Sequence, residues 1–295
     1  PFVTNTQERP SQIIRSAADF SYPTYHEFLS EEDHFNNTSG ILKHQHNYYL
    51  YGNKIDFVGG NTYANILKID SASWSITGEW NYQVGTFGNR CLSLQATPDD
   101  HLAFILNYDG GAGPGIPRGH QIIKIDTAGN VLDSIDFKGL SYDAPRLLVD
   151  EAEAYYFSSR DHPILGWPYL SNGRINKLST NLDSLEWSLE LPSEPNTLER
   201  TYEIKDYIQA QNGDIIAAGG VFHIDADDNA NFNGFITRVS LEREIIWLKL
   251  YKLNQDIPDA LPSTYKEALL FQIQETPAGG FVALGVSEYL TPDLT

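Results

Sequence analysis

Short apolar runs separated by polar turns recur along most of this chain. The clearest example lies between Cys91 and Phe137, where the runs CLSLQAT, HLAFILN, HQIIKID and VLDSIDF are rich in β-branched and other apolar residues. The turn TPDD follows the first run and TAGN follows the third, while a long segment containing Gly and Pro joins the middle pair. Short strands bounded by such turns predict a four-stranded antiparallel meander.

Three sequence marks show that this unit is repeated. A basic residue inside the third apolar run recurs at intervals of 53 to 61 residues, at Arg15, Lys68, Lys124, Lys177 and Arg238. The fourth run tends to carry an aromatic residue, as at Trp80, Trp187 and Trp247, and Gln95, Gln209 and Gln274 precede the first turn. We interpret the basic residue as a structural cation paired with a nearby carboxylate, and the Trp as a filler between adjacent repeats.

Complete repeats cover residues 41–83, 91–137, 145–192 and 206–251, and two further strands follow at 269–288. Residues 12–30 contain the missing pair, because QIIRS matches a third strand and TYHEFL a fourth. The predicted fold is therefore all-β: a five-bladed β-propeller of four-stranded antiparallel blades, formed by residues 1–295 as one domain and closed by a composite blade from both termini. The alternative is a piece of a longer array, whose remaining strands lie outside this sequence.

The amino-acid composition excludes two kinds of binding partner, nucleic acid and the membrane interior. With 20 Lys and Arg against 39 Asp and Glu, the formal net charge is −19. Such a surface repels phosphate backbones, so nucleic acid is not an expected partner. No window approaches the ~18 consecutive apolar residues of a membrane span, so membrane insertion is not expected either. Cys91 is the single cysteine, which excludes an internal disulfide, and the absence of methionine suggests a processed or excised chain.

The long connections fall at one end of the predicted blades, where the second strand joins the third and where one repeat joins the next. Loops on a rigid scaffold commonly carry binding residues, so this long-loop face is the predicted ligand surface. Aromatic rings and polar groups suit a protein partner or a glycan, and the candidate contacts are His120, His162, Trp167, Tyr169 and His223. The alternative for each is packing within its own loop.

One loop has the spacing of a calcium site. Oxygen donors at Asp225, Asp227, Asn229 and Asn231 match the first four ligand positions of a calcium-binding loop. The loop departs from that pattern because Ala230 replaces the glycine of the bend, and Ile236 stands where a bidentate glutamate closes the site. A solvated polar turn is the other interpretation. No other cofactor is expected.

An enzymatic function is the alternative to binding. Paired carboxylates carry out glycosidic cleavage, and Asp109, Asp143 and Asp161 lie in loops that could bring them to the mouth of a central channel. The chain would then be a glycoside hydrolase or lyase. The marked similarity between the repeats favours a scaffold without catalysis.

Two motifs resemble those of a known group. Thr276, Pro277, Gly279, Gly280, Phe281 and Gly285 form T-P-x-G-G-F-x-x-x-G; Lys124, Ile125, Asp126 and Gly129 form K-I-D-x-x-G; and a fourth-strand Trp follows in other repeats. The pattern resembles the propeller repeats of secreted Bacteroidota proteins and covers about residues 12–290. The resemblance implies an extracellular or outer-surface protein serving adhesion, assembly or glycan capture. We therefore expect a non-catalytic binding or scaffold module with its ligand or partner on the long-loop face.

Overall fold

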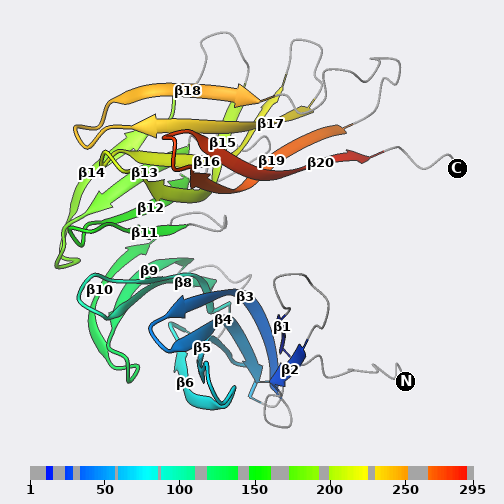
Figure 1. The fold of residues 1–295 in the computed structure, drawn as a ribbon, viewed down its shortest axis with the longest axis vertical. Helices are drawn as coiled ribbons and strands as arrows, with labels where there is room; N and C mark the ends of the chain where they lie inside the picture. Colours follow the sequence, from blue (N-terminus) through cyan, green and yellow to red (C-terminus); the bar gives the residue numbers. More distant parts are fainter. Residues whose placement is uncertain are drawn as a thin grey trace, which may run out of the picture. The chain divides into compact units, whose positions relative to one another are not determined.

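The computed structural model describes residues 11–15, 24–28, 34–56, 59–85, 88–109, 118–138, 146–160, 173–192, 199–224, 230–251 and 265–290 (Figure 1). Within these ranges every regular element is a β-strand. The predicted all-β class is therefore confirmed. The described part of the chain contains no helix able to cross a membrane.

The chain forms two compact units, and the first comprises Pro1–Gly139. It contains a hairpin of β1 (Ser11–Arg15) and β2 (Thr24–Phe28) and two four-stranded sheets in the orders β3-β4-β5-β6 and β7-β8-β9-β10. All paired neighbours are antiparallel. The sheet strands are β3 (His34–His44), β4 (Asn47–Asp56), β5 (Thr62–Asp70), β6 (Ile76–Tyr82), β7 (Arg90–Ala96), β8 (Leu102–Asp109), β9 (Arg118–Ile125) and β10 (Val131–Lys138).

The second unit comprises Leu140–Thr295 and contains two further four-stranded meanders followed by a strand pair. The meanders are β11-β12-β13-β14 and β15-β16-β17-β18, and β19 pairs with β20. One parallel contact, Asn231 with Lys266, links β19 to β17. The strands are β11 (Leu147–Val149), β12 (Tyr155–Arg160), β13 (Gly173–Leu178), β14 (Leu185–Glu190), β15 (Glu199–Gln209), β16 (Ile215–Ile224), β17 (Ala230–Val239), β18 (Ile245–Tyr251), β19 (Tyr265–Glu275) and β20 (Phe281–Leu290).

Each of the four complete repeats predicted from the sequence forms a four-stranded antiparallel meander; three are separate sheets, and β15–β18 is joined by β19 and β20 in a six-stranded sheet. Two of them begin earlier than predicted, at His34 and Glu199, because their first strands extend further toward the preceding loop. The prediction of one domain over residues 1–295 is not tested by these two units and stays a prediction.

Local turn chemistry explains why the repeats could be found from sequence. In the turn between β7 and β8, the Thr97 amide donates to the His101 carbonyl at 3.0 Å, and Asp100 adopts a φ of 63°. The turn between β15 and β16 has the same bond between Ala210 and Asp214, and Gly213 takes the left-handed position at φ 90°. Glycine reaches this conformation without steric cost, so it recurs at this place in the repeat.

Apolar side chains from adjacent sheets interleave to form the core of each unit. In the first unit, Tyr49 and Ile66 of one sheet pack with Phe104, Leu106 and Ile123 of the next. In the second unit, a single cluster joins the sheet β11–β14 to the sheet β15–β18.

The fourth-strand Trp residues lie at these junctions between sheets. Trp187 is only 8% exposed within the cluster of the second unit, and the Trp247 ring centroid lies 6.2 Å from that of Phe281. Trp80 packs against the core cluster of the first unit. The interpretation of these Trp residues as fillers between repeats is confirmed.

A β-bulge interrupts the first strand of most sheets. It adds one residue to the longer first strands, and the extra residues are Ser39 in β3, Leu92 in β7, Lys205 in β15 and Phe271 in β19. Because a bulge shifts the alternation of side chains by one, residues before and after it can face different neighbours.

The composite blade is not confirmed. β1 pairs with β2, and β20 pairs with β19, but no pairing joins these two hairpins among the described residues. A blade shared by the termini depends on pairing between segments at opposite ends of the chain. Five blades and ring closure therefore stay predictions.

Candidate functional site

Most residues predicted from sequence to act in function lie outside the described residues. These are Asp143, Asp161, His162, Trp167, Tyr169, Asp225, Asp227 and Asn229. The backbones of Asp109, His223 and Asn231 belong to β8, β16 and β17, but their side chains are likewise outside the described set. No group of three His, Cys, Asp or Glu side chains that could hold a metal occurs in the described part of the chain. The roles suggested for these residues stay predictions.

His120 is the one predicted ligand contact whose side chain is described. It lies on β9 opposite Asn107 of β8 and Phe137 of β10. Only 2% of the residue is exposed. In this structure His120 therefore occupies a packed position within its sheet, with little surface left for a ligand.

The repeated third-strand cations have polar partners, as predicted. Lys124 lies 2.8 Å from Asp99, Lys177 lies 2.9 Å from Glu186, and Arg238 lies 2.6 Å from Asp214. Lys68 differs, because its ammonium donates to the carbonyl oxygen of Thr127 at 3.2 Å. These side chains are part of the framework.

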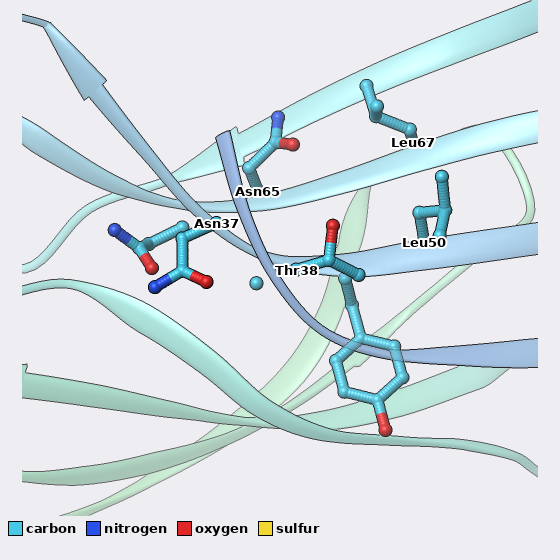
Figure 2. A pocket seen from close by; sticks show the side chains of 8 residues that line it. Asn37, Thr38, Leu50, Asn65 and Leu67 are labelled. Atoms are coloured by element: carbon cyan, nitrogen blue, oxygen red, sulfur yellow. The ribbon is translucent and has the colours of Figure 1, made fainter. Parts of the chain in front are cut away.

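A small hollow opens in the first unit, where β3, β4 and β5 run side by side (Figure 2). Its empty volume is ≈ 180 Å³, and Asn37 and Thr38 of β3, Leu50 of β4, and Asn65 and Leu67 of β5 are among the residues lining it. The cavity volume comparable with ligand pockets is only ≈ 10 Å³, about the space for a single water, whereas pockets for drug-sized ligands have about 300–1,000 Å³. The hollow therefore suits ordered water better than a ligand.

A closed polar network lies beside this hollow. The buried Lys54 ammonium lies 2.7 Å from Glu79 Oε1, and the Asn65 amide donates to the same oxygen at 3.2 Å. Asn65 also donates to Asn81 Oδ1 at 2.9 Å. A buried lysine keeps its charge only when it is paired and hydrogen-bonded in this way. The network stabilises the first sheet from within.

The second unit gathers a different set of charged residues where β15 meets the neighbouring sheets. Arg146, which immediately precedes β11, donates from Nε to the Lys205 carbonyl at 2.5 Å. Asp206 Oδ2 accepts the Ile273 amide of β19 at 2.9 Å. The Lys205 ammonium is paired with the Glu203 carboxylate. We call Arg146, Glu203, Lys205 and Asp206 the first-strand cluster.

The bulge at Lys205 explains this arrangement. Tyr202, Ile204 and Tyr207 are all buried in the core shared with the sheet β11–β14. Because the bulge intervenes between Ile204 and Asp206, Asp206 instead follows the alternation of Ile208 and packs toward Ile273. β15 therefore contributes apolar side chains to two cores, and Glu203, Lys205 and Asp206 lie on the same strand.

Asp206 has a perturbed acidity. Burial raises its pKa above the ordinary value, while the amides of Ile273 and Tyr207 and the charge of Arg146 act in the opposite direction. A carboxyl group with a perturbed pKa beside a cation is a common feature of functional sites, although framework groups show it as well.

Sequence analysis did not identify the first-strand cluster. A signal was present, because Glu203-Ile204-Lys205-Asp206 places three charged residues in a strand that also contributes Tyr202 and Tyr207 to the core. The run resembles the ordinary polar face of a strand unless the bulge is known. Arg146 is distant in sequence, so only the fold brings it to this place.

Together, these features define the chain as an all-β protein of repeated four-stranded antiparallel sheets. No protein-family model and no curated protein matches it. Among solved structures, the mannose phosphorylase MPT-4 from Leishmania mexicana is similar at a TM-score of 0.46 and 10% identity, over 84% of this chain and 78% of that chain. A xylan β-1,4-xylosidase from Bacillus halodurans C-125 is similar at a TM-score of 0.41 and 14% identity, over 80% of this chain and 51% of that chain. Likeness at this level assigns neither an activity nor a ligand to the chain.

Proposed function

We propose that this protein is a non-catalytic binding module that holds a glycan or a protein partner against its first strands and long-loop face. The observation that carries the proposal is the first-strand cluster. Arg146, Lys205 and Asp206 are each partly exposed; bonds to backbone hold the side chains of Arg146 and Asp206, and the Lys205 ammonium is paired with Glu203. Side chains held in this way bind a ligand without a large loss of conformational entropy.

The cellular location of the module is inferred from the repeat motifs. The likeness to secreted Bacteroidota repeats supports an extracellular or outer-surface location, where adhesion and glycan capture take place. The net charge of −19 supports partners other than nucleic acid. The predicted contacts His162, Trp167, Tyr169 and His223 belong to the same proposed surface.

Binding of the intact protein to arrays of glycans and of surface-protein peptides tests the proposal. We expect at least one ligand that binds in solution, is recovered chemically unchanged after incubation, and binds more weakly to Arg146→Gln. Recovery of cleaved ligand would replace the binding module with an enzyme. The absence of any ligand on either array would remove the proposal.

The alternative is a glycoside hydrolase or lyase, and one observation favours it. Burial raises the pKa of Asp206, as is needed for a carboxyl group that donates a proton near neutral pH. In that case the loop carboxylates Asp109, Asp143 and Asp161 stay the predicted catalytic residues. Loss of polysaccharide turnover in the four separate Asp→Asn variants, with ligand binding retained, would establish the enzyme.

We also propose that the β1–β2 hairpin completes the sheet begun by β19 and β20, giving a closed five-bladed propeller. In three complete sheets the third-strand cation lies opposite the second residue of the second strand: Lys124 opposite Ala103, Lys177 opposite Tyr156, and Arg238 opposite Ile216. The second residue of β20 is Val282. The same register would place Arg15 opposite Val282 and Ile13 opposite Leu284.

The internal register of the hairpin supports this assignment. Arg15 pairs with Thr24 at the sequence separation that joins Lys124 to Asp133 and Arg238 to Trp247. In the other two complete sheets the separation is ten residues, from Lys68 to Gly78 and from Lys177 to Trp187, so the register of the hairpin is compatible with a third and fourth strand. In addition, Val282 and Leu284 are 62% and 65% exposed on β20, whereas the corresponding Ala103 and Ile105 of β8 are fully buried. An exposed apolar edge strand of this kind is a ready template for further strands.

A pair of cysteines tests closure. In dilute protein under mild oxidation, we expect Ile13→Cys with Leu284→Cys to form an intramolecular disulfide, because directly opposed strand residues lie within disulfide reach. Gln12→Cys with Leu284→Cys is the matched control, since the two side chains would point to opposite faces. The native Cys91 is fully buried and should not interfere. Equal yields from both pairs, or intermolecular disulfides only, would exclude this register.

Calcium binding at Asp225, Asp227, Asn229 and Asn231 is a separate proposal. Removal of bound calcium with a chelator should lower the melting temperature, because a ligand specific to the folded state stabilises it. Asp227→Ala should abolish the effect of the chelator. An unchanged melting temperature would leave this loop a solvated turn.

A further inference from the structure

The first-strand cluster has hydrogen-bonding groups that the fold leaves unused. Arg146 donates from its side chain through Nε, and its terminal amino groups have no hydrogen-bond partner among the described residues. Asp206 uses Oδ2 to accept the Ile273 amide, and Glu203 uses Oε1 toward Lys205. The Asp206 carboxyl also accepts the Tyr207 amide, but a carboxylate has about four acceptor sites, so both acids keep acceptor capacity. The first-strand cluster thus combines hydrogen-bond donors on Arg146 with acceptors on Glu203 and Asp206.

The charge of the cluster restricts what it can bind. Two cations and two carboxylates cancel, whereas the whole chain carries −19. An anionic ligand would meet the two carboxylates locally and the negative field of the protein at long range. A cationic ligand would meet Arg146 and Lys205. Neither sign of net charge is favoured, so a neutral ligand fits best.

A neutral partner for such a site must both donate and accept hydrogen bonds. Each hydroxyl group donates one bond and accepts two, so a pair of adjacent hydroxyls can accept from a guanidinium and donate to a carboxylate. Bonds to charged groups are the stronger ones, and here the charged groups are already oriented by the backbone. Sugars without carboxylate or sulfate groups present adjacent hydroxyls of this kind.

We propose that the first-strand cluster is a binding site for neutral glycans, with Arg146 donating to one sugar hydroxyl and Glu203 and Asp206 accepting from its neighbours. This inference rests on the proposed binding function and names the ligand class of the same site. Lys205 acts as a positioning residue, because its carbonyl oxygen fixes Arg146 and its ammonium orients Glu203.

Calorimetric titration of the intact protein tests the site. The probes are cellohexaose, mannohexaose and xylohexaose as neutral ligands, and a galacturonate hexamer as a charged ligand of similar size. We expect at least one neutral hexasaccharide to bind about tenfold or more tightly than the galacturonate. Arg146→Gln and Glu203→Gln should each weaken that binding about tenfold, the effect of losing one hydrogen bond to a charged group.

Lys249→Gln is the matched control, because it removes a positive charge from β18, where the ammonium lies over the Trp247 ring, away from the cluster. It should leave affinity unchanged. Urea unfolding of every variant separates loss of binding from loss of folding, and Asp206→Asn, which keeps an acceptor for the Ile273 amide, provides a second variant of the site that should remain folded.

The possible results are distinct. Neutral binding that Arg146→Gln, Glu203→Gln and Asp206→Asn all leave unchanged would overturn this site but not the binding function. Preference for the galacturonate would overturn the ligand class. Failure of all four hexasaccharides to bind would overturn the inference, while a peptide ligand found on the arrays would still support the proposed function.

Discussion

Two sets of charged residues lie in the strands of this protein, and they differ in how fully their hydrogen-bonding groups are used. The third-strand cations Lys124, Lys177 and Arg238 each have a carboxylate partner within their own sheet. The first-strand cluster instead bonds largely to backbone groups of neighbouring strands. A charge in a strand therefore does not by itself mark a ligand site. The two sets differ in how many hydrogen-bonding groups remain unused in the folded protein.

The acids of the two sets show the same contrast. Although burial acts against it, hydrogen bonds from Lys124, Thr97 and His101 hold the pKa of Asp99 well below its ordinary value. Burial raises the pKa of Asp206, and Arg146 offsets this only in part. Ionised Asp99 stabilises the fold, whereas ionised Asp206 is held at a cost to it.

The largest expected effect concerns Arg238. Substitution of Arg238 by Met should lower the free energy of unfolding by about 2–3 kcal/mol, because the nearly buried Asp214 carboxylate would lose its positively charged partner. Ligand affinity should not change. Urea denaturation gives the first value and calorimetry the second. Loss of ligand affinity at unchanged stability would show that Arg238 contributes to ligand binding rather than to the framework.

Substitution of Arg146 should reduce ligand affinity more than stability. Arg146→Gln removes one hydrogen bond to the Lys205 carbonyl, which is worth about 1 kcal/mol of stability. Its effect on ligand affinity should be larger, about tenfold, since the guanidinium is the main donor of the cluster. Comparison of the unfolding and binding energies of the two arginine variants checks the distinction directly. If both variants lose only stability, the first-strand cluster is framework.

Lys177 should show a smaller effect. It lies 2.9 Å from Glu186, whose side chain is 41% exposed against 11% for Asp214, so solvent screens this pair more. Lys177→Met should cost about 0.5 kcal/mol. High salt should reduce the difference between variant and wild type further, and urea denaturation at two ionic strengths measures it. A cost as large as that of Arg238→Met would contradict the dependence on burial.

The smallest effect is the pH dependence of Asp206. Its folded pKa is raised above the unfolded value, so the folded protein binds this proton more tightly. The resulting stabilisation is present below the ordinary aspartate pKa and is lost as the pH rises through the raised value. Asp206→Asn should remove this slope. Thermal unfolding across the acidic range compares the two proteins, and parallel curves would show that Asp206 does not titrate separately.

The repeats could be predicted because their signals are local. A turn such as Ala210–Asp214 needs one residue in the left-handed region, which is Gly213 here and Asp100 in another repeat, and the third-strand cation follows at a similar sequence distance in each complete repeat. The bulge at Lys205 has no such local signal, since a shift by one residue is decided by packing on both sides of the strand. The meeting of Arg146 with Lys205 joins residues from different sheets, and periodicity cannot reveal it.

The extra residue in each first strand has a consequence for how such a protein can change. Ser39, Leu92, Lys205 and Phe271 occupy this place in four sheets and differ in size, polarity and charge. Each is surplus to the regular ladder, so its identity is not dictated by pairing across the strands. New recognition chemistry can therefore be introduced one sheet at a time at the bulge residues that reach solvent, Ser39, Lys205 and Phe271, whereas Leu92 is buried.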